Sequence, residues 1–512
     1  MDGRVAQGRS PLASPVPSPS STFVNVAVGV CLVAIALFVY TVSHPYRYYN
    51  HFEWQAAAFL EGQAAIRYPV EPTATSPGNA FFQDVLPVPT TDGVPRGLVP
   101  FPPLPAIVLM PFVALWGLNA DGQLIFAILG AIDVGLAWWM LGKLPIRRWV
   151  RIAATIFFGF GTVFWYTAQL GTTWYQAHVL AVGLALAAIG LALSDDVASA
   201  FDEDEIDAGG AGAAAVAGPG AVAGATSALV RSPSIAARLR PDRRQFVAGL
   251  LFGLACTSRL TVVFAAPFFV FVGSGGSWQR RGWSAALGAG IPLAALAVYN
   301  LVTTGHILHP GYQHLYELEA GFYKPLNYHI DWWIEDVRYL PQNFGIMFLN
   351  TPVWLPKEVP SALGLGGPLC TAPDSVRGWF NLDCPLFLPR DTGMSVLLTS
   401  PAYLLVLPAL RWGYGHSRLV TGAAIAVLIV TLVNLAHFSQ GWVQFGYRFS
   451  NDFAPWALLL VAIGLDRVAS RARTPTAWPI TARLVLVLAV GLVALSVLVN
   501  LWGVAWGDAL GW

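Results

Sequence analysis

Charged residues are scarce in this sequence. Asp, Glu, Lys and Arg make up 11% of the 512 residues, whereas a soluble domain carries about 25%. Hydrophobic residues reach 55%, and the mean hydropathy is +0.57. This composition excludes a soluble protein and makes the lipid bilayer the expected partner. The net charge of +1 and the lack of a basic, aromatic-interleaved patch give no sign of a nucleic-acid partner.

The usual motifs of soluble enzymes are also missing. The sequence has no phosphate loop, no GxGxxG, no HExxH, no CxxC and no GxSxG. Cysteine is rare, with four residues in all. Cys31 and Cys256 lie in apolar runs and are interpreted as inert core residues, whereas Cys370 and Cys384 lie in a long polar loop. Any chemistry must therefore come from polar residues in loops and at helix ends.

What the sequence does have is a series of long apolar runs. A bilayer requires about 20 apolar residues for each helical span. The runs cover 22–42, 104–120, 122–142, 152–170, 174–194, 245–273, 283–302, 395–410, 419–437, 453–468 and 484–503. They predict an all-α polytopic membrane protein with about 10–12 transmembrane helices. The run 245–273 is interrupted at Thr257-Ser258-Arg259, which is typical of two half-helices.

Basic residues orient these spans, because cytoplasmic loops carry an excess of Lys and Arg. Five short segments are basic: 143–151, 238–244, 280–281, 411–418 and 467–483. We therefore expect a multi-pass protein of the plasma (inner) membrane with a cytoplasmic N-terminus and two large extracytoplasmic loops, 43–103 and 303–394. Both loops can be external only if 104–120 is a re-entrant or interfacial segment.

The remaining segments complete the domain organisation. Residues 1–21 are rich in Pro and Ser and are predicted to be a disordered cytoplasmic tail. The stretch 195–244 changes from acidic through Ala/Gly-rich to basic and is predicted to be a disordered cytoplasmic linker. Residues 22–512 otherwise form a single transmembrane domain.

Each outer loop is expected to carry a short helix on the membrane surface. In the first, Phe52, Ala56, Phe59 and Leu60 share a helical face and Glu53 lies off it. In the second, a helical face is formed by Ile330, Trp333, Ile334 and Val337. If the second loop faces an oxidising compartment, Cys370 and Cys384 can form a disulfide.

Two carboxylates of the first outer loop are candidate bases. Glu53 belongs to the cluster that contains Asn50 and His51, and Asp84 follows later in the loop. A carboxylate at the membrane surface can deprotonate an acceptor hydroxyl or hold a divalent cation. The alternative is that these are ordinary solvated loop carboxylates.

Two arginines are candidate anion ligands. Arg259 stands alone in an apolar stretch, where a charge usually faces an interior site or an anionic partner. Arg448 follows Tyr447 in an outward loop, and its guanidinium suits a phosphate. Two alternatives stay open: Arg259 snorkels to headgroups, or Arg448 pairs with Asp452 four residues later.

A further polar segment contains Tyr312 and the histidines at 306, 309 and 314. The histidines suit either a metal or a substrate contact, and no partner motif supports the metal, so a metal site stays unknown. Within the apolar run 122–142, Asp133 raises the same question as Arg259, with a simple polar helix contact as the alternative.

Taken in order, these features resemble the GT-C superfamily of integral membrane glycosyltransferases, nearest to its protein O-mannosyltransferase-like branch. The matching pieces are the first span, the Asn50-His51-Phe52 helix, Asp84, the Pro102-Pro103-Leu104-Pro105 segment, Gly249 to Arg259, Tyr299-Asn300 with Gly311-Tyr312, and Gly446-Tyr447-Arg448-Phe449. Many members carry an Asp close to the end of the first span. Here only Glu53 lies there, so Asp84 is the favoured base and Glu53 the second choice.

The resemblance implies transfer of a sugar from a polyprenyl-phosphate-linked donor to a glycan, lipid or protein acceptor on the outer face. A carboxylate would act as general base. Arg259 and Arg448 would hold the carrier phosphate, with Asn50, His51, Tyr312, Tyr447 and Asp452 as further substrate contacts. A divalent cation, Mg²⁺ or Mn²⁺, is an optional cofactor. The alternatives are a transporter, which would not need such large outer loops, and a flippase-like protein of envelope assembly.

Overall fold

The structure is a computed structural model, and it describes residues 19–42, 49–193, 240–322, 331–359, 366–441, 443–473 and 479–512. Most of the predicted tail 1–21, residues 195–239 of the predicted linker and Ile330 lie outside the described residues, so their predictions stay predictions.

Helices dominate the described chain, and the prediction of an all-α polytopic membrane protein is confirmed. The helices of ten or more residues are α1 (Pro19–Val42), α2 (His51–Leu60), α3 (Leu104–Trp116), α4 (Gly122–Leu141), α5 (Arg148–Phe160), α7 (Thr173–Ala192), α10 (Arg243–Cys256), α12 (Trp278–Thr304), α13 (Gly311–Phe322), α17 (Arg418–Ala436), α18 (Ala454–Arg471) and α19 (Pro479–Ala509). The shorter ones are α6 (Phe164–Leu170), α11 (Phe268–Phe271), α14 (Leu340–Phe344), α15 (Val396–Thr399) and α16 (Val406–Gly413). Single 3₁₀ turns include η2 (Leu260–Ala265), η4 (Val337–Tyr339), η6 (Pro401–Leu405) and η7 (Arg448–Asp452).

Six of the described helices are long and apolar enough to cross a membrane: residues 22–42 of α1, α4, α7, α12, α17 and residues 480–509 of α19. The helices α5 and α6 make a seventh span if the pair, bent by 50°, is counted as one. Of the other predicted runs, 453–468 forms most of the unbroken helix α18, and the rest are shorter or broken helices. The run 104–120 forms a short helix ending in a 3₁₀ turn at 119, which suits the predicted re-entrant or interfacial segment.

The break predicted in the run 245–273 is confirmed. Helix α10 ends at Cys256, and the chain resumes only as the 3₁₀ turn η2 after Arg259. Two glycines one turn apart, Gly249 and Gly253, bring α10 so close to α12 that a Cβ on either would collide with the α12 backbone. Small residues at such spacing allow close helix contact in membranes.

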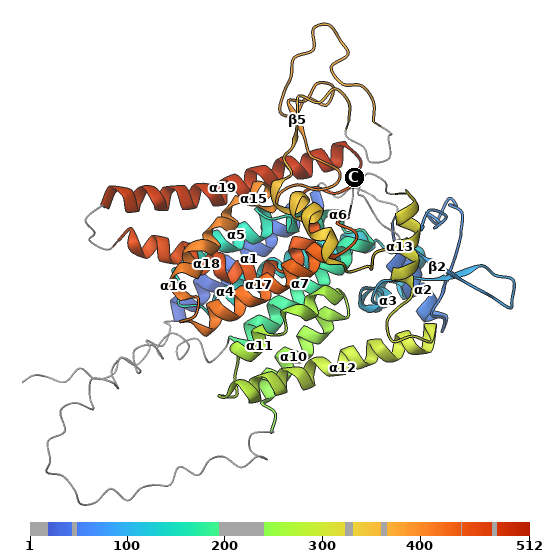
Figure 1. The fold of residues 1–512 in the computed structure, drawn as a ribbon, viewed down its shortest axis with the longest axis horizontal. Coiled ribbons are helices and arrows are strands. Elements are labelled where there is room, and N and C mark those ends of the chain that lie inside the picture. The colour runs from blue at the N-terminus through green and yellow to red at the C-terminus, as the bar shows by residue number, and fades with distance from the viewer. Residues whose placement is uncertain are drawn as a thin grey trace, which may run out of the picture.

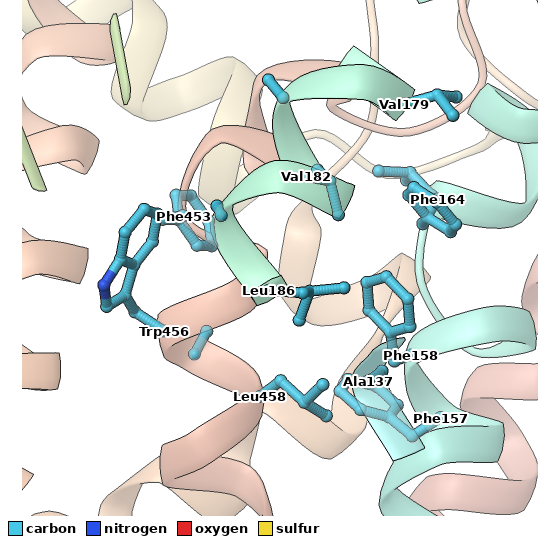
Figure 2. Packing of buried hydrophobic residues seen from close by; sticks show 14 of the residues in the cluster. Ala137, Phe157, Phe158, Phe164, Val179, Val182, Leu186, Phe453, Trp456 and Leu458 are labelled. Atoms are coloured by element: carbon cyan, nitrogen blue, oxygen red, sulfur yellow. The ribbon is translucent and has the colours of Figure 1, made fainter. Parts of the chain in front are cut away.

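Helix α7 lies in the middle of the bundle, against α4 on one side and α10 on the other. Figure 2 shows Val182 and Leu186 of α7 beside Phe158 and Phe164, with Trp456 and Leu458 of α18 across from them. Because this core holds α7 from several sides, the position of its first turns is well fixed.

The first outer loop is more closely packed than its sequence suggested. Helix α2 forms where predicted, but it is buried on nearly every side, and Glu53 is 2% exposed instead of facing solvent. The alternative that Glu53 is an ordinary solvated carboxylate is therefore wrong. A small antiparallel sheet with the order β1-β3-β2 (Ile66–Arg67, Arg96–Leu98 and Leu86–Val88) covers this end of the bundle, as Figure 1 shows.

In the second outer loop, the prediction of a helical face from 330 to 337 is wrong for the described residues. Residues 331–336 form a turn and a β-bridge from Glu335 to His437, and only the 3₁₀ turn η4 follows. Further on, β4 (Val353–Trp354) pairs with β5 (Phe387–Leu388), and Cys370 and Cys384 form a disulfide. Of the other two cysteines, Cys256 is buried as expected, but Cys31 lies on the exposed side of α1.

Candidate active site

The first polar group joins α2, the first outer loop and α7. His51 Nε2 lies 2.6 Å from Asp84 Oδ1, and His51 Nδ1 lies 2.9 Å from the Thr173 hydroxyl. The backbone N–H of His51 also donates to Thr173 Oγ1, so a side chain of α7 caps the start of α2.

Aromatic rings hold the His51 imidazole in place. It stacks on Phe82 with a centroid separation of 3.8 Å. The ring centroids of Phe101 and Trp174 lie 6.0 and 5.8 Å from that of His51. His51 and Asp84 are 0% and 5% exposed. The second oxygen of Asp84, Oδ2, is buried and has no hydrogen-bond partner among the described residues. The pair thus holds one carboxylate oxygen in a fixed orientation without a hydrogen-bond partner among the described residues.

Glu53 lies two residues along α2, near the start of α4. Its Oε1 accepts a hydrogen bond of 3.3 Å from Gln176 of α7, and a Cβ on Gly122 would collide with the same oxygen. Burial raises the pKa of Glu53 to about 7, although its own backbone and Gln176 lower it, and the nearby charge of Asp121 raises it further. Its second oxygen has no partner among the described residues. Glu53 can therefore gain or lose a proton near neutral pH.

The second polar group centres on Asp452 at the end of η7. Arg259 binds its carboxylate with both Nε and Nη2 at 3.1 Å, and the Thr261 hydroxyl donates to Oδ2 at 2.8 Å. His178 Nδ1 lies 3.1 Å from Oδ1. Burial acts to raise the pKa of Asp452, but Arg259 and His178 outweigh it and hold that pKa well below its usual value. Asp452 is thus a buried anion whose charge Arg259 neutralises.

Arg448 lies beside this pair but has no carboxylate partner among the described residues. Its guanidinium lies 5.7 Å from the Tyr175 ring and 5.3 Å from the Phe449 ring, and its Nε is buried without a hydrogen-bond partner. The loop before it is tightly wound: Gly441 and Gly446 adopt left-handed backbone conformations, and a Cβ on Gly441 would collide with the Arg448 guanidinium. The loop therefore presents an uncompensated cation between aromatic faces.

The two groups meet at the start of α7 and at Tyr312. Thr173 faces His51, while His178, five residues or about 7.5 Å further along the helix axis, faces Asp452. Burial raises the pKa of Tyr312; Arg259 lowers it, and Asp452 and Asp84 raise it further. The phenol is therefore within electrostatic reach of both carboxylates.

The other predicted site residues have more local roles. Tyr447 is fully buried and donates a hydrogen bond to Gln440, and Asn50 precedes α2 with an amide oxygen that has no partner among the described residues. The alternative pairing of Arg448 with Asp452 is wrong, because Asp452 binds Arg259 instead. Since Asp452 is inaccessible and fully engaged, it orients Arg259 and does not offer a free oxygen to a substrate.

Sequence reasoning missed His178, Thr173, Gln176 and Thr261. The first three occupy the opening turns of an otherwise apolar run. An ionisable side chain in such a run is a functional candidate by default, so His178 carried a usable signal. Thr261 carried none, because a single Thr after a helix break is common.

The optional metal of the sequence prediction finds no support in the donor set. Among the described residues, no group of three or more His, Cys, Asp and Glu side chains could hold a metal ion. We therefore assign no role to a metal.

Comparisons with known proteins give little further help. No family model matches the chain, and no curated protein matches it. Among solved structures, the archaeal oligosaccharyltransferase AglB from Archaeoglobus fulgidus, in complex with an inhibitory peptide and a dolichol-phosphate, is similar over 94% of this chain. The identity is 12%, the TM-score is 0.44, and the match covers 56% of that chain, so this chain spans a little over half of its length. A likeness of this extent carries no argument about site or substrate.

Proposed function

We propose that this chain is a membrane glycosyltransferase of the GT-C type, which moves a sugar from a polyprenyl-phosphate-linked donor to an extracytoplasmic acceptor. One observation carries the proposal most directly. Arg448, a cation with no carboxylate partner among the described residues, lies beside a neutralised Arg259–Asp452 pair. Near the first turns of α7, which contact His51 and Glu53, Asp84 and Glu53 each keep a buried carboxylate oxygen without a partner among the described residues. An uncompensated arginine suits a phosphate, and an open carboxylate suits a base.

In the proposed reaction, Asp84 Oδ2 removes the proton of the acceptor hydroxyl as its oxygen attacks the anomeric carbon of the donor sugar. The bond from that carbon to the phosphate oxygen breaks, and its electron pair leaves with the polyprenyl phosphate. Arg448 binds the growing charge on the leaving phosphate, with Arg259 beside it. His51 holds Asp84 in position through the 2.6 Å contact.

Glu53 is the second candidate for the base, and its raised pKa supports that role. A base works best when its pKa lies near the working pH, and the pKa of Glu53 is about 7. Asn50 and Tyr312 remain proposed substrate contacts, whereas Tyr447 acts through Gln440 on the loop that carries Arg448.

The test is incubation of purified protein with candidate polyprenyl-phosphate sugars, followed by detection of free polyprenyl phosphate. Release that requires an acceptor, and that is lost in Asp84→Asn or Glu53→Gln, supports the proposal. A matched control is Arg338→Ala, since Arg338 is exposed and its ion pair is with its neighbour Asp336, in the second outer loop. Failure of every donor to react, in protein that binds none of them, would contradict it.

A transporter is the second candidate, and Asp133 is the observation that favours it. This carboxylate is 4% exposed in the middle of α4, lies against Gly183 of α7, and has one oxygen without a partner among the described residues. Buried carboxylates in spans commonly serve ion pathways. If Asp133→Asn abolishes solute uptake into proteoliposomes while no lipid phosphate is ever released, transport replaces glycosyl transfer.

A further inference from the structure

The disulfide-containing part of the second outer loop exposes large apolar side chains. In the described residues between 353 and 388, Trp354 is 65% exposed and Trp379 is 62% exposed. The other exposed large apolar residues of this segment are Leu355, Val376, Phe380 and Leu382. A soluble surface rarely gathers so many, and such a patch usually marks a site of contact with a protein or a membrane.

This patch is held rigidly. The disulfide joins Cys370 to Cys384, and Arg377 donates hydrogen bonds to the carbonyls of Pro356 and Pro385. Since the backbone is tied at several points, the exposed rings are not merely parts of an unstructured tail.

The patch rests on the last turns of α19. Phe387 lies 5.1 Å from the Trp502 ring and 4.8 Å from the Trp379 ring, and Trp506 donates a hydrogen bond to the carbonyl of Trp379. In Figure 1 the loop around β5 projects roughly perpendicular to the long helices, on the side of the bundle that carries α19. A segment that extends in this direction lies along the plane of a membrane.

The length of α19 puts this contact at the edge of the bilayer. Its exposed apolar side chains begin at Ile480 and continue to Leu501. At 1.5 Å per residue these 21 steps cover roughly 32 Å, close to the 30 Å or so of a hydrocarbon core. Trp502, the next residue, therefore falls where hydrocarbon gives way to headgroups, and Trp and Tyr are enriched at that depth.

We infer that this loop docks on the outer leaflet, with Trp354, Trp379 and Phe380 at the boundary between headgroups and acyl chains beside α19. The apolar surface of the patch continues the lipid-facing surface of α19, so one bilayer covers both. This inference does not depend on the proposed glycosyl transfer.

The test places an environment-sensitive fluorescent amino acid at Phe380 by stop-codon suppression, which leaves the disulfide intact. The protein is reconstituted in phosphatidylcholine–phosphatidylglycerol vesicles with or without lipids that carry a nitroxide high on the acyl chain. Leu498, on the exposed side of α19, is the lipid-facing control, and Glu317, exposed on α13, is the aqueous control. We expect the nitroxide to remove most of the fluorescence at Phe380 and Leu498 but little at Glu317.

Two outcomes would overturn the inference. If aqueous iodide quenches Phe380 as strongly as Glu317 and the nitroxide does not, the patch faces solvent. If neither quencher reaches Phe380, a protein surface covers the patch, either a second copy of this chain or another part of it.

Discussion

Asp84 and Asp452 are two carboxylates near the first turns of α7. Their surroundings are similar, but they differ in how many of their oxygens have a partner. Asp84 and Asp452 are both buried, and each contacts a histidine. Asp452 has both oxygens engaged in hydrogen bonds, by Arg259 and Thr261. Asp84 uses one oxygen for His51 and keeps the other without a partner among the described residues.

This difference indicates which carboxylate can act as a base. A buried carboxylate that binds an arginine with both oxygens and has a lowered pKa is a poor base, because the ion pair stabilises its ionised form. An oriented carboxylate with a free oxygen can accept a proton from a substrate. In the proposed reaction, therefore, Asp452 fixes Arg259 and Asp84 reacts.

The largest expected effect is on turnover in Asp84→Asn. The amide oxygen can still accept from His51 Nε2, so the fold is kept, but the base is lost. Removing a general base typically lowers the rate by about 10²–10⁴-fold. Polyprenyl phosphate released per minute is the measurement, and Asp374→Asn, at an exposed position of the second outer loop, is the control. Full activity in Asp84→Asn together with loss in Glu53→Gln would transfer the role to Glu53.

The next effect is on stability in Asp452→Asn. Removing one partner of a buried ion pair leaves Arg259 with an uncompensated charge, which typically costs about 3–5 kcal/mol. Thermal unfolding in detergent should show a large drop in midpoint. The matched control is Glu61→Gln, which weakens the exposed pair with Arg67 and should leave the midpoint unchanged. Equal midpoints for both variants would mean that the Arg259–Asp452 pair is not a structural element.

How much of this could be predicted from the sequence follows from the same comparison. The apolar runs predict the helices, because burial in lipid requires long uncharged stretches, and Arg259 marked the break in 245–273. Which charged residues pair could not be predicted. Arg448 lies four residues from Asp452, yet Asp452 binds Arg259, which is 193 positions away. Local spacing favoured the near partner, and tertiary packing selected the far one.

The burial of Glu53 was missed for a related reason. Helical periodicity assigned it to a polar face, which assumes one buried side and one wet side. Helix α2 is instead covered by α3, by the start of α4 and by α7, so both sides are buried. Only the sequence positions of those covering helices were predictable, and their positions in space were not.

A smaller effect is the pH dependence that Glu53 should impose on stability. Its pKa is about 7 in the folded protein, against 4.5 for an unperturbed group, so the folded state holds a proton that the unfolded state has lost. Stability should therefore fall as pH rises from about 4.5 to 7, by about 3 kcal/mol in total, and then level off. Glu53→Gln should lack this fall, whereas Glu61→Gln, at the exposed end of α2, should keep it. Parallel unfolding curves for wild type and Glu53→Gln across this range would contradict the assignment.

The smallest effect, and the one that separates the two arginines, concerns Arg448. Because Arg448 has no carboxylate partner among the described residues, Arg448→Ala leaves no buried anion behind and should not destabilise the fold. It should instead weaken donor binding, since a charge-assisted hydrogen bond contributes about 1.5–3 kcal/mol, or roughly 10- to 100-fold in KM. Arg259→Ala should weaken donor binding and also destabilise the fold, because it leaves the buried Asp452 carboxylate without its arginine partner. Measuring KM for the lipid-linked donor and the unfolding midpoint of each variant checks this, with Arg448→Lys reporting how much of the effect comes from the guanidinium fork. If Arg448→Ala lowers the midpoint as far as Arg259→Ala and leaves KM unchanged, Arg448 is a structural residue and the phosphate must bind elsewhere.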